Sequence, residues 1–222
     1  MNAQERSKLF SHELNLFSST AIRNFAFHCL SRLPEYFFNI PASASGKYHP
    51  AYTLGEGGLV RHTKAAIQIL EHLSSAGILY YYSCPLLGAP DDAYDACLLA
   101  LMFHDAFKLG IPQDFSQPSL GEEAHTDHAH PLHASSFLLS SVESFLQNYD
   151  ANNSDLEVIH EAASAVTSHM GRWVTSSRSS VVLPSPAGGD WVAKIVHLCD
   201  YLASRKNIEI KLATEDMNGG ES

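Results

Sequence analysis

The spacing of apolar residues constrains the fold of this chain more than any other feature of its sequence. Leu59, Ala66 and Leu70, for example, recur at the period of an α-helix that buries one face. No segment alternates convincingly between apolar and polar residues, as a half-buried strand would. Residues 78–82 and 180–183 are candidates for short strands, but two such segments are too few for a sheet. The sequence therefore predicts an all-α fold.

Helix start and stop signals divide the chain into about seven helices. Pro131 suits the first turn of a helix, and Ser154 forms an S-x-x-E capping box with Glu157. Gly171 suits the C-terminal cap of the helix that this box begins, and Asp190 suits the start of the last helix. The predicted helices span residues 5–16, 20–33, 58–75, 92–107, 131–149, 154–170 and 191–206.

Length and composition are those of an ordinary globular protein. The chain has 222 residues, of which 45% are hydrophobic and 17% charged, and this suits one packed domain. We expect N-terminal helices and an ordered loop packed on the core (1–56), a helical domain (57–208) and a flexible tail (209–222). No apolar run reaches the roughly 18 residues of a membrane span. Four scattered cysteines fit a reduced, cytoplasmic setting.

The net charge of −10 at pH 7 argues against a broad basic face and therefore against binding of extended nucleic acid. Half of the basic residues nevertheless lie close to the motifs described below. They form either ordinary solvated surface or a small anion pocket, and the sequence leaves both open. These residues are Lys47, Arg61, Lys64, Lys108, Arg172, Arg205 and Lys206.

Ionisable residues in apolar helical segments carry the functional signal. In LALMFHDAFK, His104 and Asp105 come at the end of an apolar stretch, where burial is costly unless they are paired or bind a metal. His62 (GGLVRHT), His169 (SHMGRW) and Asp200 (VHLCDYLASRK) lie in comparable settings. Imidazole and carboxylate together suit Mn, Fe, Co, Ni or Zn, with Mg as a further option. The sequence therefore indicates one or two divalent metal ions.

From about residue 57 to residue 206, these ordered motifs resemble the HD-domain superfamily, an all-helical group with the pattern H…HD…D and extra histidines in its two-metal members. The resemblance implies a helical bundle around a metal centre. It implies four ligands for a first metal: His62, His104, Asp105 and Asp200. In a two-metal member Asp105 would bridge both ions, and His169 would bind the second.

The other histidine of the second site is open between several residues. HPLHAS looks like the H-P-x-x-G element of two-metal relatives, with Ala134 at the glycine position, and this favours His130. The proline that follows makes His130 the expected N-cap residue, with its side chain off the helix end. His133 is the rival ligand, and is otherwise expected as a hydrogen-bond partner behind a ligand or as a substrate contact. His125 and His128 are weaker candidates.

The resemblance implies hydrolysis by metal-activated water. A bound ion lowers the pKa of its water to about 7, and a second ion about 3.5–4 Å away helps to clamp a phosphoryl group. Lys108 follows Asp105 on nearly the same face of the predicted helix, so both are expected to be catalytic, with Lys108 neutralising phosphate charge. Arg61 and Arg172 are expected to bind phosphate through their guanidinium groups.

Hydrolysis of a phosphoester or phosphoanhydride is the leading function, with a nucleotide or short oligonucleotide as substrate. Tyr48, Trp173 and Tyr201 offer flat rings for a base, and His49 either lines the pocket or belongs to a simple turn. One alternative is a mixed-valent di-iron oxygenase on the same fold. Another is a catalytically idle domain that binds a nucleotide or a partner. A homo-oligomer is left open, and no membrane partner is expected.

Overall fold

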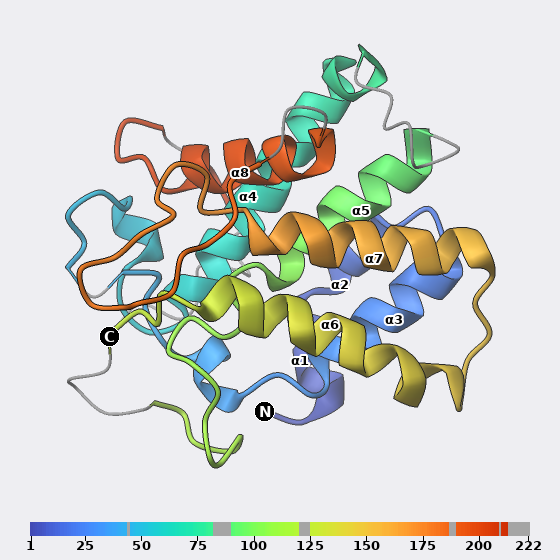
Figure 1. The fold of residues 1–222 in the computed structure, drawn as a ribbon, viewed down its shortest axis with the longest axis horizontal. Coiled ribbons are helices and arrows are strands. Elements are labelled where there is room, and N and C mark those ends of the chain that lie inside the picture. The colour runs from blue at the N-terminus through green and yellow to red at the C-terminus, as the bar shows by residue number, and fades with distance from the viewer. Residues whose placement is uncertain (44, 82–89, 120–124, 187–189, 209, 213–222) are drawn as a thin grey trace.

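The computed structural model describes residues 1–43, 45–81, 90–119, 125–186, 190–208 and 210–212. Within these ranges the chain is all-α, as predicted (Figure 1). The helices are α1 (Ala3–Leu9), α2 (Ser11–Asn15), α3 (Thr20–Leu30), α4 (Gly58–Ser75), α5 (Pro90–Phe103), α6 (His130–Leu146), α7 (Asn153–Thr167) and α8 (Trp191–Ala203). Short 3-10 turns lie at Glu35–Phe38, Ala51–Thr53 and Ile78–Tyr81. None of the described helices is both long and apolar enough to cross a bilayer.

The N-terminal half of the prediction needs three corrections. The expected helix 5–16 is divided at Phe10, which caps both α1 and α2. The helix expected over 20–33 ends at Leu30, before the turn that leads to Pro34. The helix expected to reach residue 107 ends at Phe103, because the chain continues in successive tight turns up to Gly110. By contrast, α4 has the predicted bounds.

The C-terminal half differs in its capping residues. Helix α7 begins at Asn153, and Asn152 and Asp155 form its capping box. The expected Ser154–Glu157 box is therefore wrong. Asparagine is as good an N-cap as serine. Because α7 ends at Thr167, Gly171 is not its C-cap.

Helices α6 and α8 are shorter at their C-terminal ends than predicted, and Asp190 caps α8 as expected. Residues 78–81 and 180–183 form no strand. Residue 82, and the predicted tail except for 210–212, lie outside the described residues.

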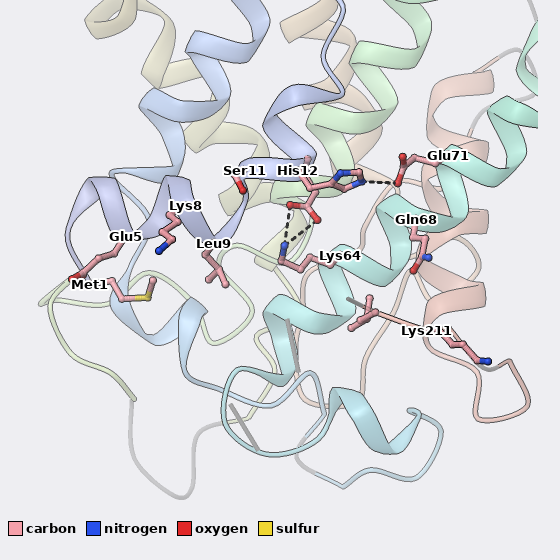
Figure 2. A pocket seen from close by; sticks show the side chains of 12 residues that line it. Met1, Glu5, Lys8, Leu9, Ser11, His12, Lys64, Gln68, Glu71 and Lys211 are labelled. Atoms are coloured by element: carbon pink, nitrogen blue, oxygen red, sulfur yellow. Dashed lines mark hydrogen bonds and ion pairs between the residues drawn. The ribbon is translucent and has the colours of Figure 1, made fainter. Parts of the chain in front are cut away.

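The N-terminal helices α1 and α2 pack against α3, and a buried ion pair joins α2 to α4. The Lys64 ammonium on α4 lies 3.0 Å from both carboxylate oxygens of Glu13 on α2 (Figure 2). His12 and Glu71 form a second, more exposed contact of 3.3 Å beside it. These pairs surround a cavity of about 540 Å³. Lys64 therefore faces α2 and does not contribute to an anion pocket at the histidine motifs.

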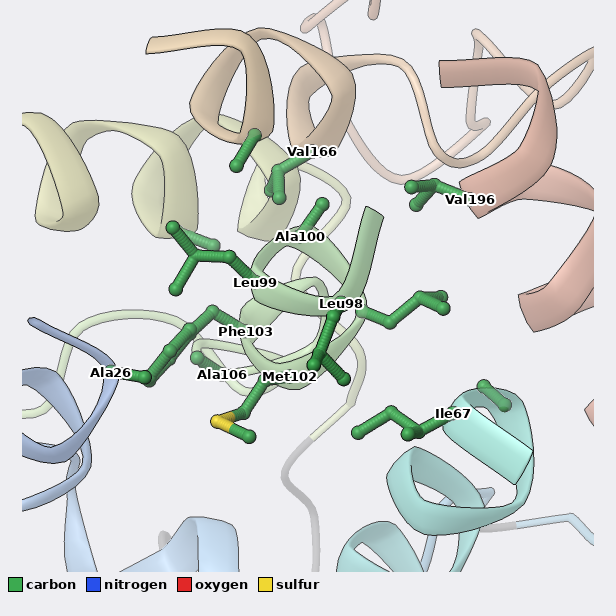
Figure 3. Packing of buried hydrophobic residues seen from close by; sticks show 14 of the residues in the cluster. Ala26, Ile67, Leu98, Leu99, Ala100, Met102, Phe103, Ala106, Val166 and Val196 are labelled. Atoms are coloured by element: carbon green, nitrogen blue, oxygen red, sulfur yellow. The ribbon is translucent and has the colours of Figure 1, made fainter. Parts of the chain in front are cut away.

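Helix α5 forms the centre of the core. Its residues from Ala96 to Phe103 are almost fully buried, and its side chains radiate toward Ala26 of α3, Ile67 of α4, Val166 of α7 and Val196 of α8 (Figure 3). Burial of these aliphatic groups contributes about 25 cal/mol per Å² of apolar surface. The packing fixes the direction of α5 and thereby the position of the residues that follow it.

Candidate metal centre

Six ionisable side chains from five parts of the fold meet where α5 ends. His104 and Asp105 follow α5 directly and are almost fully buried. His62 comes from the second turn of α4, and His130 is the first residue of α6. The last two residues are His169, two residues beyond α7, and Asp200 on α8. The structure thus brings together every residue for which the resemblance implied a ligand role.

The six residues form two groups that could each hold a metal ion: His62, His104 and Asp200, and Asp105, His130 and His169. In the first group, the His62 Nε2 atom lies 3.0 Å from Asp200 Oδ1 and 3.3 Å from His104 Nε2. In the second, His130 Nε2 lies 3.0 Å from Asp105 Oδ1 and 3.3 Å from His169 Nε2. Ligands at about 2.1 Å from an ion are about 3.0 Å apart in an octahedron and about 3.4 Å apart in a tetrahedron, so these separations fit coordination.

Asp105 lies between the two groups. Its Oδ1 atom faces His130, while its Oδ2 atom lies 3.6 Å from His104 Nε2 and 3.8 Å from His62 Nε2. The Lys108 ammonium approaches the same Oδ2 atom at 2.5 Å. One carboxylate therefore presents one oxygen to each group, which is the arrangement that a bridging ligand requires.

The hydrogen bonds of the rings make their Nε2 atoms lone-pair donors. The Nδ1 atom of His130 lies 2.6 Å from the Asp127 carbonyl oxygen, and that of His169 lies 2.8 Å from the Val166 carbonyl oxygen. A carbonyl only accepts, so each Nδ1 carries a proton, and in the neutral His169 ring the lone pair lies at Nε2. The two Nε2 atoms lie 3.3 Å apart, and such an approach needs a metal ion or a proton between them. The donor set of the second group therefore fits a metal ion.

The first group has a similar feature. The Nδ1 atom of His104 donates to the Leu101 carbonyl oxygen at 2.7 Å, which leaves its Nε2 atom toward His62. The buried Nδ1 atom of His62 has no hydrogen-bond partner within the described part of the chain. The His62 ring therefore does not find its full set of partners among the described groups.

Burial and the neighbouring charges have opposite effects on the pKa values of the two aspartates in this centre. Burial, with help from His104 and His130, lowers the pKa of His169 to about 3, so that this ring is neutral at pH 7. Burial would raise the pKa of Asp105, but Lys108 and His104 hold the pKa well below its usual value. The pKa of Asp200 is likewise held low by His104 and His62 against the effect of burial. Ionised carboxylates and a neutral imidazole are the forms that bind metals.

A cavity of about 440 Å³ opens above Asp105, His130, His169 and Asp200. This volume is within the range of small-molecule sites. Three cations line it: Lys108, Arg172 and Arg205. Among its described lining residues the only acids are the two aspartates of the metal groups. The cavity is therefore suited to an anionic ligand.

Two of the expected substrate contacts lie outside this cavity. Arg61 is buried, and its guanidinium donates to the carbonyl oxygens of Tyr52, Leu54 and Glu56. It therefore fixes the preceding loop on α4, and phosphate binding by Arg61 is not part of the site. His133 does not line the cavity either, and its Nε2 atom contacts Asp127 Oδ2 at 3.0 Å.

His130 keeps its place in the centre although its expected backbone position is wrong. The N-cap of α6 is Ala129, and His130 is the first helical residue, with the proline second. Lys108 also differs from expectation, because it lies in a turn and not on a helix, yet it still reaches Asp105. His125 and His128 are in neither metal group.

Three residues of the site were not assigned from the sequence. Asp127 holds His130 through its backbone carbonyl, and its carboxylate accepts from the Ala129 N–H at 2.9 Å. Arg205 lines the cavity, although the sequence identified it only as one of several basic residues near the motifs. His49 also lines it, with its ring centroid 5.6 Å from that of His62, which decides against a simple turn. The GKYHP segment could have indicated this, since it precedes the first ligand helix.

Comparison with protein-family models, with curated proteins and with solved structures finds no match for this chain. The chemistry of the centre has therefore to be inferred from the residues that form it.

Proposed function

We propose that this chain is a metal-dependent phosphohydrolase of the HD-domain superfamily, acting on a phosphoester or phosphoanhydride in a nucleotide or short oligonucleotide. The observation that carries the proposal is the shared position of Asp105 between two ligand groups. A bridging carboxylate under a cavity lined by cations is the arrangement that a two-metal phosphohydrolase needs.

The proposed ligands fall into the same two groups that the distances between the side chains define. His62, His104 and Asp200 hold one divalent ion, His130 and His169 hold the other, and Asp105 is shared. The mixed nitrogen and oxygen donors suit Mn, Fe, Co, Ni or Zn better than Mg. Bound metal supplies a water ligand of lowered pKa as nucleophile and polarises the phosphoryl oxygens.

The other residues of the cavity bind and orient the substrate. Lys108 keeps its ammonium beside Asp105, where a phosphate oxygen would enter. Arg172 and Arg205 provide guanidinium groups at the cavity wall, and these can bind phosphate through two parallel hydrogen bonds. The three cations thereby stabilise the negative charge that develops on phosphorus-bound oxygens in the transition state.

A di-iron oxygenase would use the same ligands, so the ligand set does not separate the two reactions. The three cations at the cavity favour the phosphohydrolase. We would purify the protein without chelator, measure its metal content, and assay generic phosphoesters and nucleotides with Mn, Ni, Co and Mg, in air and under strict anaerobiosis.

The expected result is bound transition metal and phosphoester turnover at the same rate without oxygen. Oxygen consumption coupled to substrate loss would transfer the protein to the oxygenase class. Bound metal without turnover of any substrate would instead support the idle binding domain.

A further inference from the structure

A strip of alternating cations and aromatic rings leads from the surface to the metal cavity. We call it the cation–aromatic strip, and its residues are Lys47, Tyr48, Arg172, Trp173, Tyr201 and Arg205. They come from three separate parts of the chain: the loop before α4, the turn after α7, and the C-terminal end of α8 with the residues just after it. Four of them also line the cavity: Tyr48, Arg172, Trp173 and Arg205.

One half of the strip stands at the ends of α7 and α8. The Arg172 guanidinium lies 4.9 Å from the centroid of the Trp173 ring. The Trp173 ring stacks on Tyr201, with centroids 5.9 Å apart and planes inclined by 19°. The Arg205 guanidinium covers the Tyr201 ring at 4.4 Å. The cations and rings are thus in continuous contact.

The other half joins the loop to the end of α8. The Arg205 guanidinium also lies 5.7 Å from the centroid of Tyr48, and the Lys47 ammonium lies 5.1 Å from the same centroid. The Lys206 backbone N–H donates to the Tyr48 carbonyl oxygen at 3.1 Å. This hydrogen bond holds the loop in place, so Tyr48 is presented on a fixed backbone.

The rings of the strip are unusually exposed for their size. Tyr48 is 56% exposed and Trp173 is 40% exposed. Large aromatic rings that remain in water beside cations favour a ligand with flat faces and negative charge. A chain with a net charge of −10 gains nothing in general solubility from such a cluster of cations.

We propose that the cation–aromatic strip binds single-stranded nucleic acid and leads it to the metal centre. Every base has a flat face that can stack on Tyr48 or Trp173, and the phosphates between bases can pair with Lys47, Arg172 and Arg205. A duplex has its bases already stacked and needs a broader basic face, and an acidic peptide would leave the rings unused. The strip therefore selects single strands of two or more nucleotides.

This inference names the substrate of the proposed hydrolysis and rests on that proposal for its catalytic meaning. Binding itself needs only the strip, and so it can be measured in EDTA, where no hydrolysis occurs. We would titrate fluorescently labelled oligo(dT) of about ten nucleotides, a length within known single-strand site sizes, and follow its anisotropy.

Four variants test the rings. Tyr48→Ala and Trp173→Ala should each weaken binding at least about fivefold, because stacking on one aromatic ring has an effect of that size or more. Tyr48→Phe and Trp173→Phe keep a ring and should retain most of the affinity. The matched control is Tyr149→Ala, which removes a 37% exposed ring outside the strip, three residues beyond the C-terminal end of α6, and should bind normally.

Salt tests the cations. With three phosphate contacts, the logarithm of the binding constant should fall with the logarithm of salt concentration with a slope of about −2. Arg205→Ala should reduce this slope by about 0.7, whereas Lys8→Ala, on α1, should leave it unchanged. A thermal midpoint measured for each variant separates lost binding from lost folding.

The inference is overturned if all variants bind alike, if a duplex of the same length binds as tightly, or if an acidic peptide competes equally well. Turnover of mononucleotides without oligonucleotide binding would leave the proposed function intact and remove this inference. Metal-independent binding of oligo(dT) without turnover under any metal would do the reverse.

Discussion

At the scale of single residues, the centre depends on where each histidine directs its two ring nitrogens. His104, His130 and His169 each donate from Nδ1 to a backbone carbonyl three residues earlier in the chain. The same local bond therefore fixes the tautomer at three positions and turns Nε2 toward the other ligands. A ring held in this way loses little conformational entropy when it binds a metal.

Removing the shared ligand should empty both metal sites. Asp105→Ala deletes the only carboxylate among the described residues that has an oxygen toward each group, so elemental analysis should find neither ion. His169→Ala should lose mainly the ion of the second group. The control is Asp114→Ala, a carboxylate outside both groups, which should keep the wild-type metal content. Two ions retained in the Asp105→Ala protein would disprove the bridging role.

His130 and His133 should differ strongly in their effects, although they are one turn apart. The His130 Nε2 atom lies within the second group, so His130→Ala should lower its metal occupancy and reduce turnover by several orders of magnitude. His133 contacts Asp127, whose carbonyl orients His130. His133→Ala should therefore lower metal affinity or turnover by about 10–100-fold. Metal content and kcat measured on both variants check this order. A larger loss in His133→Ala would reverse the assignment.

The sequence predicted which ionisable residues meet better than it predicted the residues around them. The six residues that meet in the two groups were selected because ionisable groups in apolar segments are conspicuous and fit one pattern. Arg61 was misassigned because the sequence does not show that three carbonyl oxygens of the preceding loop take up its guanidinium. The sequence did not assign Arg205 to the cavity, because its position there depends on a distant segment. The loop that carries Tyr48 reaches the end of α8.

At the scale of elements, the ends of helices do more for the site than their middles. The sequence predicts that helix α5 continues to residue 107, since no glycine or proline interrupts the pattern before Gly110. The chain instead makes successive i→i−3 turns, in which Ala106, Lys108 and Gly110 donate to residues three positions earlier. These turns direct both His104 and Asp105 inward, which a continuous helix would not do for adjacent residues.

The start of α4 should be sensitive to a single methyl group. A Cβ at Gly58 would overlap the carbonyl oxygen of Thr53, in the loop that packs on this helix end. Gly58→Ala should therefore destabilise the fold by about 1–3 kcal/mol and lower Tm by roughly 2–12 °C for a chain of this size. Thermal unfolding of the two proteins measures the difference.

Gly55→Ala serves as the comparison for this prediction. A Cβ there meets no atom within 4 Å, although its φ of +71° adds backbone strain. Because Gly58 has no positive φ, its loss reports steric overlap alone. An unchanged Tm for Gly58→Ala would mean that the loop yields without cost.

At the scale of the whole molecule, residues 138 positions apart meet in one group, as the contact of His62 with Asp200 shows. Helical periodicity indicated the all-α class because it is a local property. The arrangement of the helices could not be read in the same way, since it depends on the packing of α3, α4, α7 and α8 around α5. The family resemblance supplied the expectation that these distant residues converge.

Removal of the metal should therefore loosen the whole fold. Without a metal ion, the Nε2 atoms of His130 and His169 still face each other at 3.3 Å, and the N-terminal end of α6 and the turn after α7 lose a common anchor. Binding at a free-metal concentration about a thousandfold above Kd stabilises a protein by about 4.1 kcal/mol, or roughly 8–16 °C in Tm at this chain length.

Scanning fluorimetry after EDTA treatment should show this decrease, and added Mn or Zn should reverse it. The reversal should weaken as pH falls, because protons compete with the metal for the imidazole of His104, whose pKa Asp105 and Asp200 raise against the effect of burial. Asp105→Ala should be insensitive to EDTA from the start, and an equally insensitive wild-type protein would contradict the metal centre.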